Sequence, residues 1–201
     1  MACWRVRMVS EAGVKLFLRL AFALALLGAG VGASVAQSFG VSEVRAGFLA
    51  HSIDEPGPGG AVLNLTRWQD VNFEALLYLP DVDAFRWLGS PKINIGASVN
   101  LTGLENMAHL GLTWQARNIL DTKFFVEGTF GAAVHDGLLS TATVPARNLG
   151  CRFLFYQSAA LGMDITDNLS IMLAWEHASS AKVCMPNRGL TNVGVKIGYR
   201  F

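Results

Sequence analysis

The amino-acid sequence predicts an all-β fold, a closed antiparallel barrel of eight strands that spans the bacterial outer membrane. The chain has 201 residues, of which 52% are hydrophobic and only 15% are charged, and its mean hydropathy is +0.37. A soluble domain is usually about 25% charged, so this chain has little charge to cover a water-exposed surface. After residue 36, apolar and polar residues alternate, and no apolar run reaches the roughly 18 residues of a transmembrane helix. Strands are therefore the elements expected to cross the membrane.

Residues 191–201 show this alternation most clearly. Odd-numbered positions carry mostly valine, isoleucine, tyrosine and phenylalanine, whereas even-numbered positions carry asparagine, glycine, lysine and arginine. Small and polar residues on one face suit the narrow interior of a small barrel, and the apolar face suits lipid. Similar patterns place the other seven strands near residues 44–51, 71–79, 93–101, 109–115, 124–135, 151–164 and 169–179.

The connections between these strands support the barrel topology. With both termini on the periplasmic side, the short connections at 118–123 and 165–168 are periplasmic turns. The connection at 80–92 is an exception, because it is long for a periplasmic turn. The chain also ends on an aromatic residue, as is typical of outer-membrane barrels. Three longer connections fall on the extracellular side, at 52–69, 136–149 and 180–190.

Three other classes of protein are disfavoured. A soluble barrel of the calycin type would bury its apolar face and expose its polar face, which the aromatic residues and low charge argue against. A porin needs a wider barrel, because eight strands enclose packed side chains and leave no aqueous channel. A nucleic-acid-binding protein would carry a basic excess, whereas the formal net charge here is +1. Four tryptophans suit lipid-facing or membrane-interface positions: Trp68, Trp87, Trp114 and Trp175.

Residues 1–36 form a predicted signal peptide that is removed from the barrel domain, residues 37–201. Basic residues precede an apolar run, Leu20–Val31, and small residues follow it. Ser34 and Ala36 fit the −3 and −1 positions of a signal-peptidase site. The alternative is a permanent membrane anchor, but the run is about 12 residues long and a spanning helix needs roughly 20.

His177 and Ser179 are the candidate reactive residues. They continue the apolar row of the strand expected at 169–179 and, being two positions apart, they point the same way. A histidine beside a hydroxyl is the minimum for an activated nucleophile. The competing interpretation is that both side chains simply lie in the headgroup layer, where polar residues are tolerated.

Three segments near the C-terminus carry a family pattern. They read EHASSA at 176–181, PNRGL at 186–190 and GVKIGYRF at 194–201. This arrangement resembles the outer-membrane lipid A 3-O-deacylases, the PagL family, which show H-x-S-N-A, a loop with N-x-G and a final strand that ends in an aromatic residue. The general layout also agrees at 44–51 and 70–74, but the specific match covers about the last 26 residues.

The resemblance implies a serine esterase that hydrolyses the ester-linked acyl chain at position 3 of lipid A, the anchor of lipopolysaccharide, without a metal or other cofactor. By position in the motif, Ser179 would be the nucleophile and His177 the general base, while Asn187 and the backbone at Ala181 would hold the oxyanion. The outward position of the pair suits a substrate in the outer leaflet of a Gram-negative outer membrane. The resemblance leaves a homodimer open.

Two positions depart from the family pattern. Ser180 replaces the asparagine that follows the serine, and Thr191 stands where the family has the acid of its triad. Residues 180–192 contain no Asp or Glu, and Glu176 is expected to point into the barrel. Thr191 or Asn192 can orient the histidine through a hydrogen bond but supplies no charge. Two hypotheses therefore stand: a lipid A deacylase, or a non-catalytic small barrel of the OmpA or OmpX type.

Cys151 and Cys184 remain in the chain after the signal peptide is removed with Cys3. An even count in an oxidising compartment favours a disulfide between neighbouring loops, and two free thiols are the alternative. Three histidines are expected inside the barrel on separate strands, with no spacing that indicates a metal site: His51, His109 and His135.

Overall fold

The computed structural model describes residues 40–201, so the predicted signal peptide lies outside the described residues. Every strand expected from the alternation has an observed counterpart, with ends that differ by a few residues. The eight strands are β1 (Val41–Ala50), β2 (Trp68–Leu77), β3 (Lys92–Asn100), β4 (Met107–Ala116), β5 (Phe124–His135), β6 (Phe153–Asp164), β7 (Leu169–Ser179) and β8 (Leu190–Arg200).

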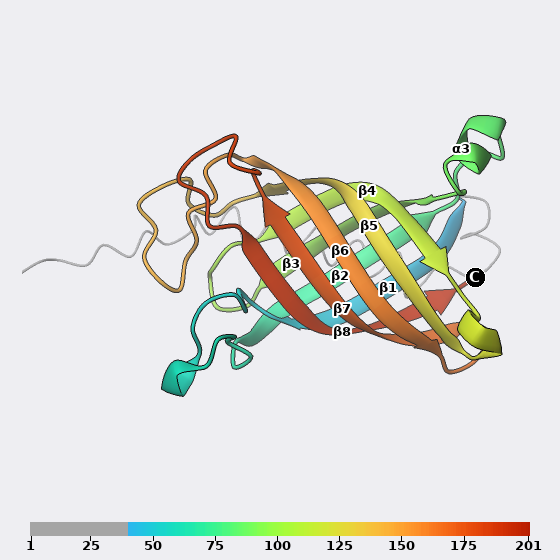
Figure 1. The fold of residues 1–201 in the computed structure, drawn as a ribbon, viewed down its shortest axis with the longest axis horizontal. Helices are drawn as coiled ribbons and strands as arrows, with labels where there is room; N and C mark the ends of the chain where they lie inside the picture. Colours follow the sequence, from blue (N-terminus) through green and yellow to red (C-terminus); the bar gives the residue numbers. More distant parts are fainter. Residues whose placement is uncertain (1–39) are drawn as a thin grey trace, which may run out of the picture.

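The strands form one closed barrel (Figure 1). Each strand pairs antiparallel with its neighbours in sequence, and β1 pairs with β8 to complete the circle. Closure leaves no strand edge without hydrogen-bond partners, which is the condition for a sheet to lie in hydrocarbon. The predicted eight-stranded antiparallel barrel is confirmed.

The outside of the barrel is an apolar belt. The outward residues follow the period of two predicted for each strand, because neighbouring side chains in a strand point to opposite faces. So much exposed apolar surface would be unfavourable in water, and it fits a lipid environment. The belt includes Phe48, Ile95, Leu110, Phe130, Leu161, Leu173 and Ile197, all between 40% and 57% exposed.

The inside of the barrel is filled by charged and polar side chains from the strands. Arg45 donates through both terminal nitrogens to the two carboxylate oxygens of Glu127, each at 2.6 Å, and lies 2.9 Å from Glu43. Lys196 donates to Glu176 at 2.7 Å and also contacts Glu74. We call these six residues the interior network. It fills the interior with paired charges.

The two ends of the barrel differ (Figure 1). One end, the long-loop end, carries the connections β1–β2, β3–β4, β5–β6 and β7–β8, with a short 3-10 helix at Pro58–Gly60. The other end, the terminal end, carries the start of β1, the end of β8 and the remaining connections. One of these holds the helix α3 (Asp83–Trp87), which the sequence did not predict, and another holds a 3-10 helix at Ile119–Asp121. Within residues 40–201, no helix is both long and apolar enough to cross a bilayer.

Candidate active site

His177 and Ser179 lie at the end of β7 that meets the long loops. Both side chains are half-buried. Along the rest of β7, outward side chains such as Trp175 are exposed and inward side chains are buried, so the exposure of the pair is intermediate. The pairing of strands places Thr191 of β8 beside His177, and Phe155 of β6 beside Ser179. The outward direction expected for the pair is therefore the one observed.

A hydrogen bond of 2.9 Å joins His177 Nδ1 to Thr191 Oγ1. The ring of Trp175 lies parallel to the imidazole, with 5.9 Å between the ring centres. Two neighbours on the outer wall thus orient the histidine from different sides. Among the hydrogen bonds of the described residues, none joins Ser179 to His177. Hydrogen bonds of this kind are often long in a ligand-free site and shorten when a substrate binds.

The residues on either side of this pair, Glu176 before His177 and Ser180 after Ser179, are buried. Glu176 accepts hydrogen bonds from Asn72, Ser98 and Lys196 and is 1% exposed, so its carboxylate is held inside the barrel and does not reach His177. Ser180 is buried, and its hydroxyl donates to the backbone carbonyl of Cys184, which closes the turn after β7. The serine that replaces the family asparagine therefore shapes a loop.

Asn187 lies in the second half of the β7–β8 connection, three residues before β8. Its side-chain amide donates to the carbonyl of Leu149 at 2.5 Å, and its Oδ1 accepts from the backbone N–H of Gly189 at 3.0 Å. Gly189 has a φ of +66°, and a Cβ there would lie 3.0 Å from His177 Cε1. Glycine thus permits both the left-handed backbone and the close approach of this loop to the imidazole.

Ala181 is exposed and has a positive φ of +49°. The structure does not join it to Asn187 by a hydrogen bond. The predicted site residues thus fall into two groups: His177, Ser179 and Thr191 lie together on the wall, while Asn187 and Ala181 belong to the loop above it.

A disulfide joins Cys151 to Cys184, with 5.6 Å between the Cα atoms. It connects the β5–β6 loop to the β7–β8 loop. The backbone N–H of Arg188 donates to the carbonyl of Asn148 at 2.8 Å, so the same two loops are also joined beyond the disulfide. Together these bonds hold the segment that carries Asn187 and Gly189.

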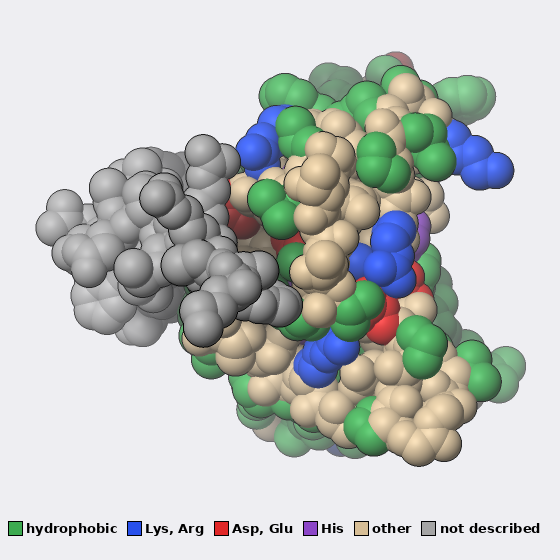
Figure 2. All heavy atoms as spheres, turned by 90° about the vertical axis from the view of Figure 1, so that its left-hand side faces the viewer, with side chains coloured by type: hydrophobic (Ala, Val, Ile, Leu, Met, Phe, Trp, Pro, Cys, Tyr) green, Lys and Arg blue, Asp and Glu red, His purple; other side chains and the backbone are tan. Residues whose placement is uncertain are grey.

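Ion pairs, with one hydrogen bond from a backbone N–H, link all four connections of the long-loop end, and the sequence did not predict them. Glu55 is 1% exposed and lies 2.9 Å from Arg67, 3.2 Å from Arg188 and 3.6 Å from Arg147. Arg147 is also buried. Its guanidinium contacts Asp54 of the β1–β2 loop, and its backbone N–H donates to Glu105 of the β3–β4 loop. We call this set the mouth network: Asp54, Glu55, Arg67, Glu105, Arg147 and Arg188. Figure 2 shows basic and acidic side chains side by side at this end.

A second set of contacts supports Thr191 from inside the barrel. The backbone carbonyl of Thr191 accepts from Ile53 N at 2.8 Å, and the side chain of the next residue, Asn192, bridges Ser52 N and Asp70. His51 contacts Asp70 at 2.8 Å through Nδ1, and its Nε2 lies 3.1 Å from Glu105. The first loop thus braces the strand residue that contacts His177.

The charge on His51 follows from these contacts. Burial acts to lower the pKa of His51, but hydrogen bonds to Asp70 and Glu105 outweigh it and raise this pKa to about 9. The histidine is therefore protonated at neutral pH, and both carboxylates bind a cation. Two further histidines expected inside the barrel are buried there: His109 stacks on the ring of Tyr156, and His135 Nε2 lies 2.6 Å from the carbonyl oxygen of Cys151.

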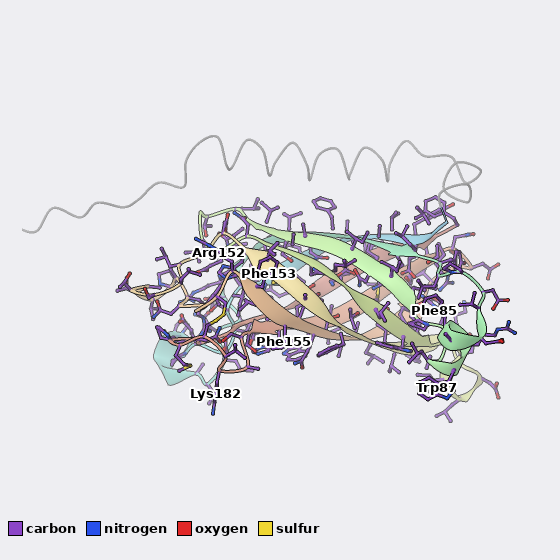
Figure 3. All side chains as sticks on the ribbon, turned by 90° about the horizontal axis from the view of Figure 1, so that it is seen from above. Phe85, Trp87, Arg152, Phe153, Phe155 and Lys182 are labelled. Carbon is purple, nitrogen blue, oxygen red and sulfur yellow. A yellow bond between two sulfur atoms is a disulfide. The ribbon has the colours of Figure 1, made fainter. Side chains whose placement is uncertain are left out.

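An apolar hollow of about 430 Å³ lies on the outer wall next to Ser179. Strand β6 forms much of it, and Phe153 and Phe155 lie one after the other along this strand (Figure 3). Its other lining residues include Ala132, Ser180, Val183 and, at the loop, Arg152. Among residues 40–201, no three His, Cys, Asp or Glu side chains come together to hold a metal ion.

A closed barrel with an apolar belt defines a membrane protein of the outer-membrane type, and the half-buried histidine and serine on its wall define a candidate enzyme site. The sequence profile described as lipid A 3-O-deacylase (PagL) matches residues 78–200, more than half of the chain. This chain belongs to that family, and it is a protein of the Gram-negative outer membrane. The resemblance seen in the sequence is confirmed.

Comparison with a solved structure of a PagL enzyme gives the same fold, and two other barrels are more distantly similar. The structure titled "outer membrane enzyme PagL" has a TM-score of 0.54 at 16% identity and covers 80% of this chain and 100% of its own. The Yersinia pestis outer membrane protein Ail has a TM-score of 0.45 at 13% identity, over 81% and 99% of the two chains. A designed transmembrane β-barrel has a TM-score of 0.40 at 13% identity, over 81% and 96%. A search of the curated proteins finds no match.

Proposed function

We propose that this protein is a serine esterase that removes the acyl chain from position 3 of lipid A in the outer leaflet. The observation that carries the proposal is the outward pair His177 and Ser179, with the hydroxyl of Thr191 hydrogen-bonded to Nδ1 of the imidazole. A reactive pair on the outside wall of a barrel can meet only a substrate that lies in the membrane. Membership of the lipid A 3-O-deacylase family supports the same substrate.

In the proposed reaction, Ser179 Oγ attacks the carbonyl carbon of the acyl ester while His177 Nε2 takes its proton. The tetrahedral intermediate collapses, the sugar oxygen leaves with the proton from His177, and an acyl-serine remains. Water, activated by the same nitrogen, then attacks the acyl-serine and releases the fatty acid, with the proton returned to Ser179. No metal or cofactor takes part in this sequence.

The reaction requires the tautomer of His177 in which Nδ1 carries the proton, and Thr191 Oγ1 is placed to accept a hydrogen bond from it. When His177 Nδ1–H donates to Thr191 Oγ1, Nε2 carries the lone pair that takes the proton of the serine hydroxyl in the proposed reaction. A carboxylate would also stabilise the imidazolium that forms, whereas a hydroxyl offers only a dipole. We therefore expect a correctly oriented site that turns over more slowly than one with an acid.

The oxyanion is assigned to Asn187 and the backbone N–H of Ala181. The amide of Asn187 is bound to Leu149 in the free site, so it must exchange this carbonyl for the oxyanion when the substrate enters. The disulfide and the contact of Arg188 with Asn148 keep the loop near enough for this exchange.

The long-loop end faces the cell exterior in this proposal. The hollow beside Ser179 then opens along the outer wall, where its phenylalanines suit an acyl chain, and Arg152 lies at the level of anionic headgroups. The homodimer stays a prediction from the resemblance.

Mass spectrometry of lipid A tests the proposal. Cells that express the wild-type protein should lose one acyl chain from position 3, and cells that express Ser179→Ala at equal levels in the outer membrane should keep it. Unchanged lipid A with a folded wild-type barrel would reject the esterase.

The second candidate is a non-catalytic barrel, which the missing carboxylate favours. Thr191→Glu distinguishes it from an incomplete enzyme. Deacylation gained with Thr191→Glu would mean that the remaining site is competent, and lipid A that stays intact in both proteins would support the non-catalytic barrel.

A further inference from the structure

The connection between β2 and β3, residues 78–91, is the long one at the terminal end. It carries the helix α3 and a group of large side chains that the rest of the described chain, residues 40–201, leaves exposed. Trp87 is 87% exposed, Tyr78 60%, Val82 44% and Leu88 42%. A water-facing turn has no need of such residues, since a shorter polar turn connects two antiparallel strands equally well.

The connection bends outward over the barrel wall. Trp114 belongs to the apolar belt on β4, and its indole N–H donates to the carbonyl of Leu88 at 2.7 Å. Gly89 packs against the same indole, with 3.5 Å between the ring and the position of a Cβ. Figure 1 shows α3 beyond the end of the strands and to one side of the barrel axis. The apolar side chains of this connection are thus continuous with the belt.

Internal hydrogen bonds hold this shape. The carbonyl of Val82 accepts from Phe85 N at 3.0 Å, Leu88 N donates to Ala84, and Ser90 N donates to Phe85 at 2.8 Å. Because the backbone is held in this way, Trp87 projects from a fixed turn. Figure 3 shows Phe85 and Trp87 on this turn at the terminal end of the barrel.

Charged groups around the turn match the headgroup layer of a bilayer. Arg86 lies 3.1 Å from both Asp81 and Asp83, and all three are largely exposed. The ammonium of Lys92 lies 5.4 Å from the centre of the Tyr78 ring, at the root of the connection. Aromatic and apolar side chains beside exposed charges are the pattern of a segment that lies in the membrane interface.

We propose that residues 78–91 form an interfacial anchor that inserts Trp87, with Val82 and Leu88, into the phospholipid leaflet at the terminal end of the barrel. The occupant is phospholipid, because the exposed group adjoins the belt through Trp114 and a bilayer already surrounds that belt. The anchor explains why this connection is long. The proposal is independent of the esterase and holds equally for a non-catalytic barrel.

A fluorescent label placed at two positions tests the anchor. Trp87 and Val62 are matched, because they are 87% and 86% exposed, but Val62 lies in a long loop at the opposite end. Trp87→Cys and Val62→Cys, each made in the full chain with Cys3→Ser, labelled with NBD and inserted into phosphatidylcholine vesicles, should differ strongly in quenching. We expect doxyl-labelled lipid to quench the label at 87 at least twofold and to leave the label at 62 nearly unchanged.

Equal quenching at both positions would overturn the anchor. Quenching that appears only at high protein-to-lipid ratio would also overturn it, since it would indicate a second copy of the chain on this surface. The fluorescence of Trp87 itself gives a second measurement. Subtracting the tryptophan emission spectrum of Trp87→Phe from that of the wild type isolates the emission of Trp87. Brominated phospholipid should quench this difference spectrum, and an unquenched spectrum would reject the insertion of Trp87.

Discussion

The interior network and the mouth network have similar chemistry but different origins. Both pair arginine or lysine side chains with buried carboxylates such as Glu55, Glu127 and Glu176. The members of the interior network stand on strands, so the register of the barrel fixes where they meet. The members of the mouth network stand on four separate loops, so their contacts fix the loops. Changes in the interior network should therefore alter the stability of the barrel, whereas changes in the mouth network should alter how well the loops around the candidate site are ordered.

Removing a cation from the interior network should have the largest effect. Lys196→Met leaves Glu176 buried without its 2.7 Å partner, and breaking a buried ion pair from one side costs about 3–5 kcal/mol. Urea unfolding in vesicles measures this loss, with the exposed Lys182→Met as the control. A loss below about 1 kcal/mol would mean that Glu176 is not held as a charged group.

Raising the pH should have the second-largest effect, a loss of stability in the loops of the long-loop end. The pKa of His51 is about 9 in the folded protein and about 6.5 in the unfolded chain. A raised pKa gives stability that is fully present below pH 6.5 and is lost as the pH rises through 9, up to about 3 kcal/mol. Hydrogen exchange of residues 51–67 between pH 6 and 10 should follow this window. His51→Gln should remove the pH dependence, and a window that persists in this variant would contradict the assignment.

Removing the centre of the mouth network should affect the loops more than the barrel. Arg147→Met deprives Asp54 and Glu55 of a partner but keeps the backbone N–H that contacts Glu105, and we expect about 2 kcal/mol of lost protection in residues 51–67 and 180–189. Strand peptides should keep their protection. If the strands lose as much as the loops, the two networks are not separable.

Neutralising an exposed pair should have the smallest effect. Asp81 and Arg86 lie 3.1 Å apart, with side chains 85% and 59% exposed. Asp81→Asn should change the unfolding free energy by less than about 0.5 kcal/mol, because water and salt screen such pairs. A larger change in the same urea experiment would show that α3 contributes to the folding of the barrel.

The same division decides what could be predicted from the sequence. Alternation along one strand is a local property, so it is sufficient to predict that His177 and Ser179 point outward and that Glu176 points inward. The partner of His177 followed from the family position of Thr191. Contacts such as Glu55 with Arg188 could not be predicted, because they depend on the path of two loops that have no periodic pattern. The unusual length of the 80–92 connection is evident from the sequence, but its helix and its direction are not predictable from spacing.

The disulfide changes what a break in the backbone would do. Cys151 precedes β6 and Cys184 follows β7, at a sequence separation of 33, so the bond and the two strands form a covalent ring. The exposed turn at 165–168 closes this ring at the terminal end. A protease that cut this turn would leave one molecule under oxidising conditions and two fragments after reduction. The chain could accordingly be circularly permuted at that turn, with the hairpin of His177 and Ser179 still linked across the barrel mouth.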